Sequence, residues 1–208
     1  IPVLGETGIK IFFNGPESFT PDNRYLLGPS PEVPNFFVAA GFNSIGIQSA
    51  GGAGKVLAEW IVNGHPPMDL WDVDIRRMMP FQNNRRYLHD RTVEALGLLY
   101  AMHWPFRQPE SARGVRTSPF HQQLKARGAC FGETAGWERA NWFAPKGVAP
   151  TYEYSYGKQN WFAHSAAEHQ AVRQGVGVFD MSSFGKFLLQ GADACAVLNR
   201  VSANQVDV

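Results

Sequence analysis

Residues 35–64 read NFFVAAGFNSIGIQSAGGAGKVLAEWIVNG, and this stretch decides the fold. A short apolar run, Asn35 to Ala40, is typical of a buried strand. Apolar residues between Ala53 and Val62 recur three and four positions apart, which indicates a helix with one packed face. Asn63-Gly64 is a favourable helix end. We therefore expect a strand, a glycine-rich loop from Gly41 to Gly52, and a helix.

The glycine-rich loop does not have the spacing of a known phosphate cradle. A P-loop needs a glycine five positions before Gly54 and a hydroxyl residue after Lys55, but these positions hold Ser49 and Val56. The glycines also do not give the G-x-G-x-x-G spacing of a dinucleotide turn. Two interpretations stay open. The small residues let a helix cross a strand closely, or they let the backbone approach a flat ligand such as a flavin. The negative charge of a reduced flavin would be stabilised by the partial positive charge of a helix N-terminus.

The rest of the chain predicts a mixed α and β protein with many turns. Ser118 is expected to cap a helix, and Ala167, Ala171 and Val172 to face inward from another. The segment 132–156 is expected to consist mainly of loops and turns. Further strands are expected over 9–13, 25–28, 176–181 and 185–191, and further helices over 83–100, 165–175 and 193–200.

Composition excludes several classes of function. The formal charge of +1 over 208 residues provides no strong field for nucleic acid, and no apolar run approaches the length of a membrane helix. Cys130 and Cys195 cannot build a disulfide framework, and no CxxC or HExxH pattern indicates a metal. We expect two inert, partly buried thiols in a reducing compartment.

A run of charge links the middle of the chain to its last part. It contains Arg107, Glu110, Arg113 and Arg116. The pattern favours a solvated linker, because charged side chains are mostly exposed. The alternative is a set of cations that guides an anionic ligand.

Several longer motifs resemble one family of flavoenzymes. The stretches 19–28, 31–47 and 50–61 are similar to the C-terminal end of the FAD domain in D-amino-acid-oxidase-type amine oxidoreductases. The similarity continues through 70–77, 110–114 and 136–143 and ends with 178–187. This order resembles the dimethylglycine and sarcosine dehydrogenase family over essentially all 208 residues.

The resemblance implies three parts in a mixed α/β chain. Residues 1–64 would end an FAD domain, 65–117 would form a central linking domain, and 118–208 would begin an aminomethyltransferase-like folate domain. The family oxidises an N-methyl amine to an iminium by hydride transfer to FAD, and captures the one-carbon unit on tetrahydrofolate. Oxygen or an electron-transfer flavoprotein would accept the electrons, in a bacterial cytoplasm or a mitochondrial matrix. Because the dinucleotide-binding glycines are not in this sequence, we expect an internal piece of a longer chain.

The resemblance also implies site residues. Gly41 to Ile47 would line the flavin, with Asn43, Ser44, Ile45 and Gly46 among them, and Phe184 would pack near the pterin. In aminomethyltransferase-like domains an acid follows Asn at the position of Gln205, so one-carbon transfer is in doubt unless Asp207 substitutes. Two alternatives stay open: a scaffold or regulatory relative with degenerate sites, and a short subunit of a sarcosine oxidase-like complex.

Overall fold

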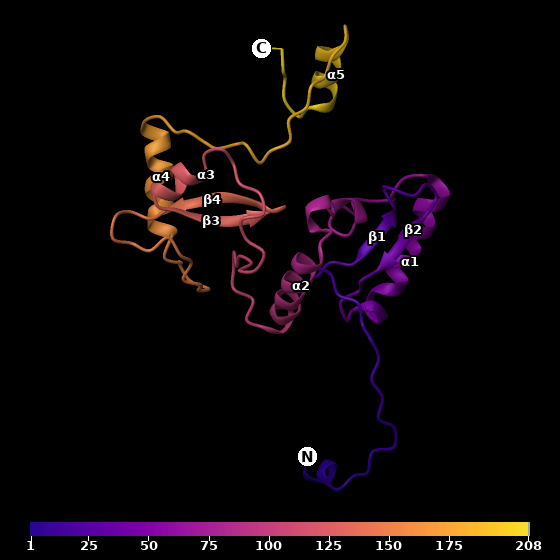
Figure 1. Cartoon of the computed structure of the whole chain (residues 1–208). Coiled ribbons are helices and arrows are strands. Elements are labelled where there is room, and N and C mark those ends of the chain that lie inside the picture. Colours follow the sequence, from indigo (N-terminus) through magenta and orange to yellow (C-terminus); the bar gives the residue numbers. More distant parts are fainter. Residues whose placement is uncertain (208) are drawn as a thin grey trace.

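The computed structural model describes residues 1–207 and forms two bodies joined by the middle of the chain (Figure 1). The first body contains β1, β2, α1 and α2, and the second contains α3, β3, β4 and α4. An N-terminal arm and a C-terminal segment with α5 extend away from them. The bounds are β1 Leu26–Pro29, β2 Phe37–Ala40, α1 Gly46–Asn63, α2 Arg85–Tyr100, α3 His121–Ala126, β3 Ala129–Thr134, β4 Trp137–Phe143, α4 Phe162–Gln174 and α5 Ala194–Val201, with short 3-10 turns at Pro2–Gly5, Ile75–Arg77 and Pro80–Gln82.

The first body is built around an antiparallel pair of strands. Leu26 of β1 lies opposite Ala40 of β2, and Leu27 is fully buried. Gly28 has φ +111° and packs against the Trp60 ring of α1, where a Cβ would come within 2.9 Å of the ring. Glycine is required at this position both by its conformation and by the lack of space. The Trp60 ring therefore fixes how α1 lies against β1.

The second body is built around a β-hairpin that the sequence analysis missed. β3 and β4 pair antiparallel through Ala135-Gly136, whose φ values of 49° and 79° are those of a type I′ turn. Trp142 is buried on this hairpin together with Cys130 and Ala144. The expectation of loops over 132–156 is wrong for this part, because the strands carry charged residues that hide their alternation.

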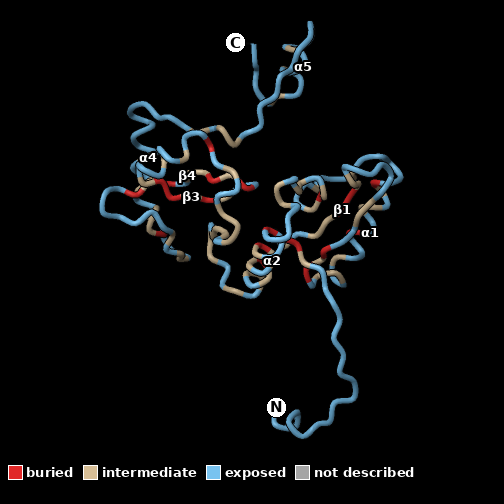
Figure 2. The backbone as a smooth tube through the Cα atoms, viewed as in Figure 1, coloured by how far each residue is buried: buried red, intermediate tan, exposed pale blue. Residues whose placement is uncertain are grey.

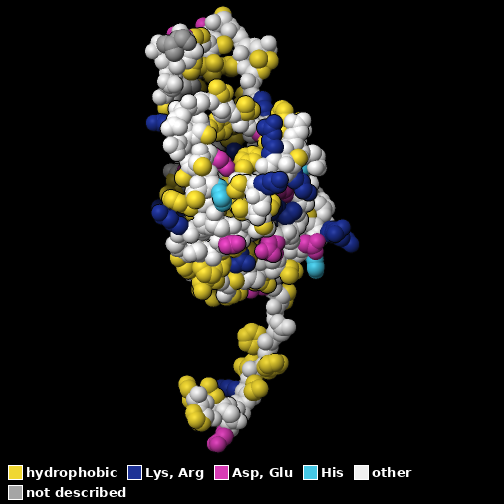
Figure 3. All heavy atoms as spheres, turned by 90° about the vertical axis from the view of Figure 1, so that its left-hand side faces the viewer, with side chains coloured by type: hydrophobic (Ala, Val, Ile, Leu, Met, Phe, Trp, Pro, Cys, Tyr) yellow, Lys and Arg dark blue, Asp and Glu magenta, His cyan; other side chains and the backbone are white. Residues whose placement is uncertain are grey.

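Three predicted strands do not form. Segments 9–13, 176–181 and 185–191 contain no strand, and their apolar side chains are mostly exposed. In Figure 2 the backbone is coloured pale blue, for exposed residues, along most of both ends of the chain. A strand needs a neighbour to pair its N–H and C=O groups, and within residues 1–207 nothing pairs with these segments. Figure 3 shows hydrophobic side chains along the N-terminal arm and around the C-terminal segment.

The predicted helices form, but α4 turns a different face inward than expected, and Ser118 does not cap α3, which begins at His121 with Phe120 as its N-cap residue. α2, α4 and α5 lie close to their predicted ranges, and Gly64 ends α1 with φ +76°. Ala167, Ala171 and Val172 are exposed, contrary to expectation, because the opposite side of α4 packs on β4. β2 is half-exposed instead of buried, and Cys195 is exposed while Cys130 is buried. No helix within residues 1–207 has the length and apolar character that a membrane crossing requires.

Candidate functional site

The loop expected to face a flavin is a five-residue turn between β2 and α1. Gly41, Asn43 and Ser44 all have positive φ, and the helix begins at Gly46. The predicted loop through Gly52 is therefore too long. Each helical glycine costs about 1 kcal/mol relative to alanine, and the burial of Ala53 and Trp60 farther along α1 offsets this cost.

Asn43 holds this turn together from inside. Its side chain is 1% exposed, and its Oδ1 accepts a 2.8 Å hydrogen bond from the Thr20 amide. Its Nδ2 donates to the Gly41 carbonyl at 2.7 Å and to Thr20 Oγ1 at 3.1 Å. A Cβ on Gly41 would lie 2.6 Å from the Thr20 methyl group. Asn43 thus binds its own backbone and the Thr20 turn, so its role is to shape the loop.

The start of α1 presents amide groups without a side-chain cap. The first N–H groups of a helix lack intrahelical partners and carry a partial positive charge. Ile47 is fully exposed at this end, and Gly46 has room for a methyl group, since a Cβ there would lie 3.4 Å from Phe42 Cβ. Ser44 Oγ donates to Glu17 Oε2 at 2.8 Å. The free amides at this helix start would suit the negatively charged edge of a reduced flavin, whereas the nearby Glu17 carboxylate would oppose it. The fold itself does not need glycine at 46.

A groove of about 580 Å³ lies on the second body between β4, α4 and the segment 178–183. Its wall includes Arg139 and Arg173, which form no ion pair within residues 1–207. The Arg139 guanidinium lies 4.7 Å from the centre of the Phe184 ring. Phe184 is half-exposed at the edge of this groove, so it lies in an open site with one arginine on its ring and is not part of a closed core.

The acid positions of the expected folate site lie away from this groove. Gln205 and Asp207 are in the exposed segment after α5, which stands off from β4 and α4 in Figure 1. Hydrogen bonds from Gln205 and Asn199 hold the pKa of Asp207 below its ordinary value. Within residues 1–207 the structure does not bring Phe184 together with either candidate.

The charged run at 107–116 is not a solvated linker. Arg113 Nε donates to Glu138 Oε1 at 2.8 Å, and the Gly114 amide donates to the same oxygen at 2.7 Å. Burial alone would raise the pKa of Glu138, but the Arg113 and Gly114 hydrogen bonds hold it below the ordinary value. The Arg116 guanidinium lies 4.4 Å from the Trp137 ring centre. The run therefore packs along the hairpin, and among residues 1–207 Arg107 is the one arginine of the run without an acidic partner or an aromatic ring.

Two protein-family models match two different parts of the chain, and several curated proteins match all or nearly all of it. Residues 63–118 match the FAD dependent oxidoreductase central domain, and 120–208 match the GCVT N-terminal domain. 4-Methylaminobutanoate oxidase (formaldehyde-forming) from Paenarthrobacter nicotinovorans is 51% identical over all of this chain and 25% of its own length. Mitochondrial sarcosine dehydrogenase from Homo sapiens is 39% identical over 93% of this chain and 24% of its own.

This chain belongs to the dimethylglycine/sarcosine dehydrogenase family. The family comprises FAD-dependent oxidoreductases of methylated amines that carry an aminomethyltransferase-type domain. The chain spans about a quarter of the length of the curated relatives that it matches. One further relative, the mitochondrial pyruvate dehydrogenase phosphatase regulatory subunit of Mus musculus, is 37% identical over 100% of this chain and 24% of its own length.

Proposed function

We propose that the natural protein is an FAD-dependent oxidoreductase that removes a methyl group from an N-methyl amino acid such as sarcosine or dimethylglycine. The observation that carries this proposal is the uncapped start of α1, held by the Asn43 turn, in a chain 51% identical to an oxidase of 4-methylaminobutanoate. Backbone amides placed at a helix start stabilise negative charge that develops on a bound cofactor.

In that chemistry the residues of this chain would stabilise the flavin and support the loop that faces it. Bound FAD would supply the hydride acceptor for oxidation of the N-methyl carbon. The amides of Gly46 and Ile47 would stabilise the charge at the flavin edge, and Asn43 would hold them in place. Ser44 would keep Glu17 in a hydrogen bond beside this positive helix end. We also propose that 1–64, 65–117 and 118–208 are the end of the FAD domain, the central domain and the start of the folate domain.

Transfer of the one-carbon unit to tetrahydrofolate is the second part of the proposal. The groove beside Phe184 supports it, because Arg139 and Arg173 suit the anionic tail of a folate. The carboxylates on the same wall already accept hydrogen bonds from the protein, and they are Glu138, Glu168 and Asp180. Gln205 argues for weak transfer, since an amide cannot act as a base. A relative with formaldehyde-forming in its name is consistent with release of the one-carbon unit when transfer is weak.

The alternative is a scaffold or regulatory protein with degenerate sites. The relative named as a phosphatase regulatory subunit and the position of Gln205 favour it. Turnover of the natural protein with an artificial electron acceptor separates the two functions. The enzyme should convert sarcosine, dimethylglycine or 4-methylaminobutanoate to the demethylated amine, with formaldehyde released in the absence of tetrahydrofolate. A protein that binds flavin but converts none of the three supports the scaffold.

A further inference from the structure

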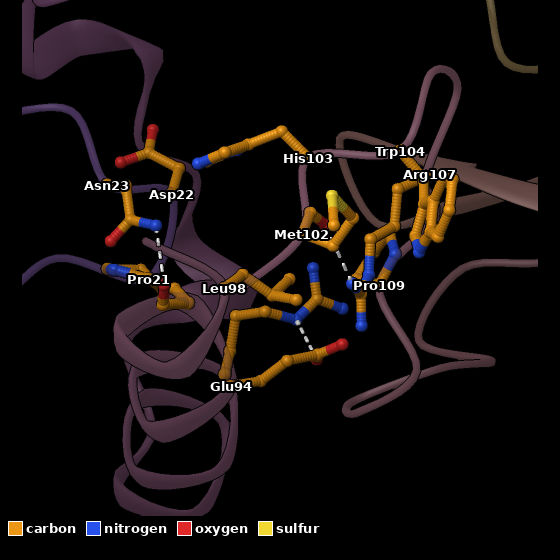
Figure 4. Close-up of a pocket in the computed structure, with 12 residues that line it drawn as sticks. Pro21, Asp22, Asn23, Glu94, Leu98, Met102, His103, Trp104, Arg107 and Pro109 are labelled. Carbon is orange, nitrogen blue, oxygen red and sulfur yellow. Dashed lines mark hydrogen bonds and ion pairs between the residues drawn. The ribbon is translucent and has the colours of Figure 1, made fainter. Parts of the chain in front are cut away.

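A cavity of about 310 Å³ lies beside α2, next to the loop that leads from the first body to the second. Its walls are the turn at Pro21–Asn23, the C-terminal half of α2 and the loop at 102–109 (Figure 4). Leu98, Met102 and Trp104 make part of the wall apolar. The volume is at the small end of the range for ligand pockets, about 300–1,000 Å³, and suits a molecule the size of an amino acid.

The acidic groups of this cavity are already bonded to the protein. Asp22 accepts two hydrogen bonds from Arg77, at 2.8 and 3.0 Å. Glu94 accepts from the amides of Glu110 and Ser111, at 2.6 and 2.9 Å. Their capacity to bind a cationic ligand is therefore largely used.

Arg91 is neutralised in the same way. Its Nη1 donates to Glu133 at 2.8 Å and its Nη2 to the Ser111 carbonyl at 2.6 Å. Its side chain is 8% exposed, so it is part of the packing between α2 and the hairpin. It supports the wall without offering a free charge.

Arg107 differs from these groups. Its Nη1 donates to the Met102 carbonyl at 3.3 Å, and no carboxylate lies within 4.0 Å of it among residues 1–207. Figure 4 places it beside Trp104, across the cavity from Asp22 and Asn23. A guanidinium has five N–H donors, so most of its donors remain available to a ligand.

We propose that this cavity binds a small carboxylate, anchored by the Arg107 guanidinium, with the apolar part of the ligand against Leu98 and Trp104. The planar guanidinium matches a carboxylate in a two-bond geometry. The carboxylates of Glu94 and Asp22 lie on the same walls and repel a doubly charged anion such as phosphate more than a singly charged one. A ligand with one carboxylate and an apolar chain therefore fits best. This site is independent of the proposed flavin and folate sites, because it uses none of their residues.

The test uses the natural protein and butanoate as the probe, with 1-butanol and butylammonium as matched probes that lack the negative charge. Equilibrium dialysis and saturation-transfer NMR measure binding, and the flavin absorbance separates any butanoate bound beside the flavin. We expect Arg107→Gln to weaken the flavin-silent binding at least tenfold. Arg127→Gln, which changes an exposed arginine elsewhere, should have no effect.

A second variant guards against loss of folding. Leu98→Trp fills the apolar wall while it keeps Arg107, and it should also weaken butanoate binding at least tenfold with an unchanged melting temperature. The proposal is overturned if wild-type protein shows no flavin-silent binding up to about 10 mM butanoate, which would mean binding weaker than a millimolar dissociation constant. It is also overturned if butanol binds as well as butanoate, or if Arg107→Gln binds like wild type.

Discussion

Asn43→Ala should destabilise the first body strongly, because the Asn43 side chain satisfies two buried backbone groups. The substitution leaves the Thr20 amide and the Gly41 carbonyl without partners, and it places alanine at φ 49°. An unpaired buried group costs about 1–3 kcal/mol, and a left-handed non-glycine residue about 1 kcal/mol more. We expect the free energy of unfolding to fall by roughly 4 kcal/mol.

Asn35→Ala is the matched control. Asn35 also has a positive φ, 61°, but it is exposed and its side chain makes no hydrogen bond among residues 1–207. It should lose only about 1 kcal/mol. Urea unfolding of the natural protein measures both values, and hydrogen exchange over residues 18–45 shows whether the loss is local. If Asn43→Ala costs no more than Asn35→Ala, the internal hydrogen bonds do not hold the turn as described.

Three further predictions concern the flavin loop, acid stability and the folate site. Gly46→Ala should fold normally, since its Cβ would meet Phe42 at ordinary contact distance. Gly46→Val should lower the flavin content or slow flavin reduction, whereas Gly41→Ala should destabilise the fold itself. The pKa of Glu138 is lowered in the folded state, so the ionised Glu138 stabilises the fold above its unfolded pKa of about 4.5, and this stabilisation is lost as the pH falls through the folded pKa. Glu138→Gln should therefore make the stability depend less on pH in acid, and Glu153→Gln, at an exposed position, should not. Gln205→Asp should raise the rate of methylene-tetrahydrofolate formation about 10²–10⁴-fold if this position supplies a base. Loss of the rate in Asp207→Asn alone would show that Asp207 is the working acid. If neither change has an effect, this segment does not belong to the folate pocket.

The sequence predicted the elements whose signals are local. Helix α2 has an Asn84 side chain that accepts from the Tyr87 amide, and Gly64 ends α1, so both follow from neighbouring residues. The start of α1 was predicted too late, because glycine content suggested a loop. The packing of Trp60 on Gly28 comes from residues 32 positions apart and leaves no local signal.

The errors in the second body have a common physical cause. Glu133 and Glu138 interrupt the alternation of β3 and β4, and their partners Arg91 and Arg113 are distant in sequence. The Ala135-Gly136 turn was the available signal for a hairpin. Local sequence predicts strands at 176–181 and 185–191 around a turn, but it cannot supply a strand partner. The candidate residues Phe184 and Gln205 came from resemblance, and their separation in space could not be seen from order along the chain.

Anaerobic reduction of the flavin tests the central claim most directly. The natural protein, purified with its flavin, is mixed without oxygen with sarcosine, dimethylglycine or 4-methylaminobutanoate, and with glycine or 4-aminobutanoate as the unmethylated controls. The account predicts that the visible absorbance of the oxidised flavin is bleached by at least one N-methyl amine and by neither control, at a rate that rises with amine concentration. Protein that carries flavin and is bleached by none of the three N-methyl amines would contradict it.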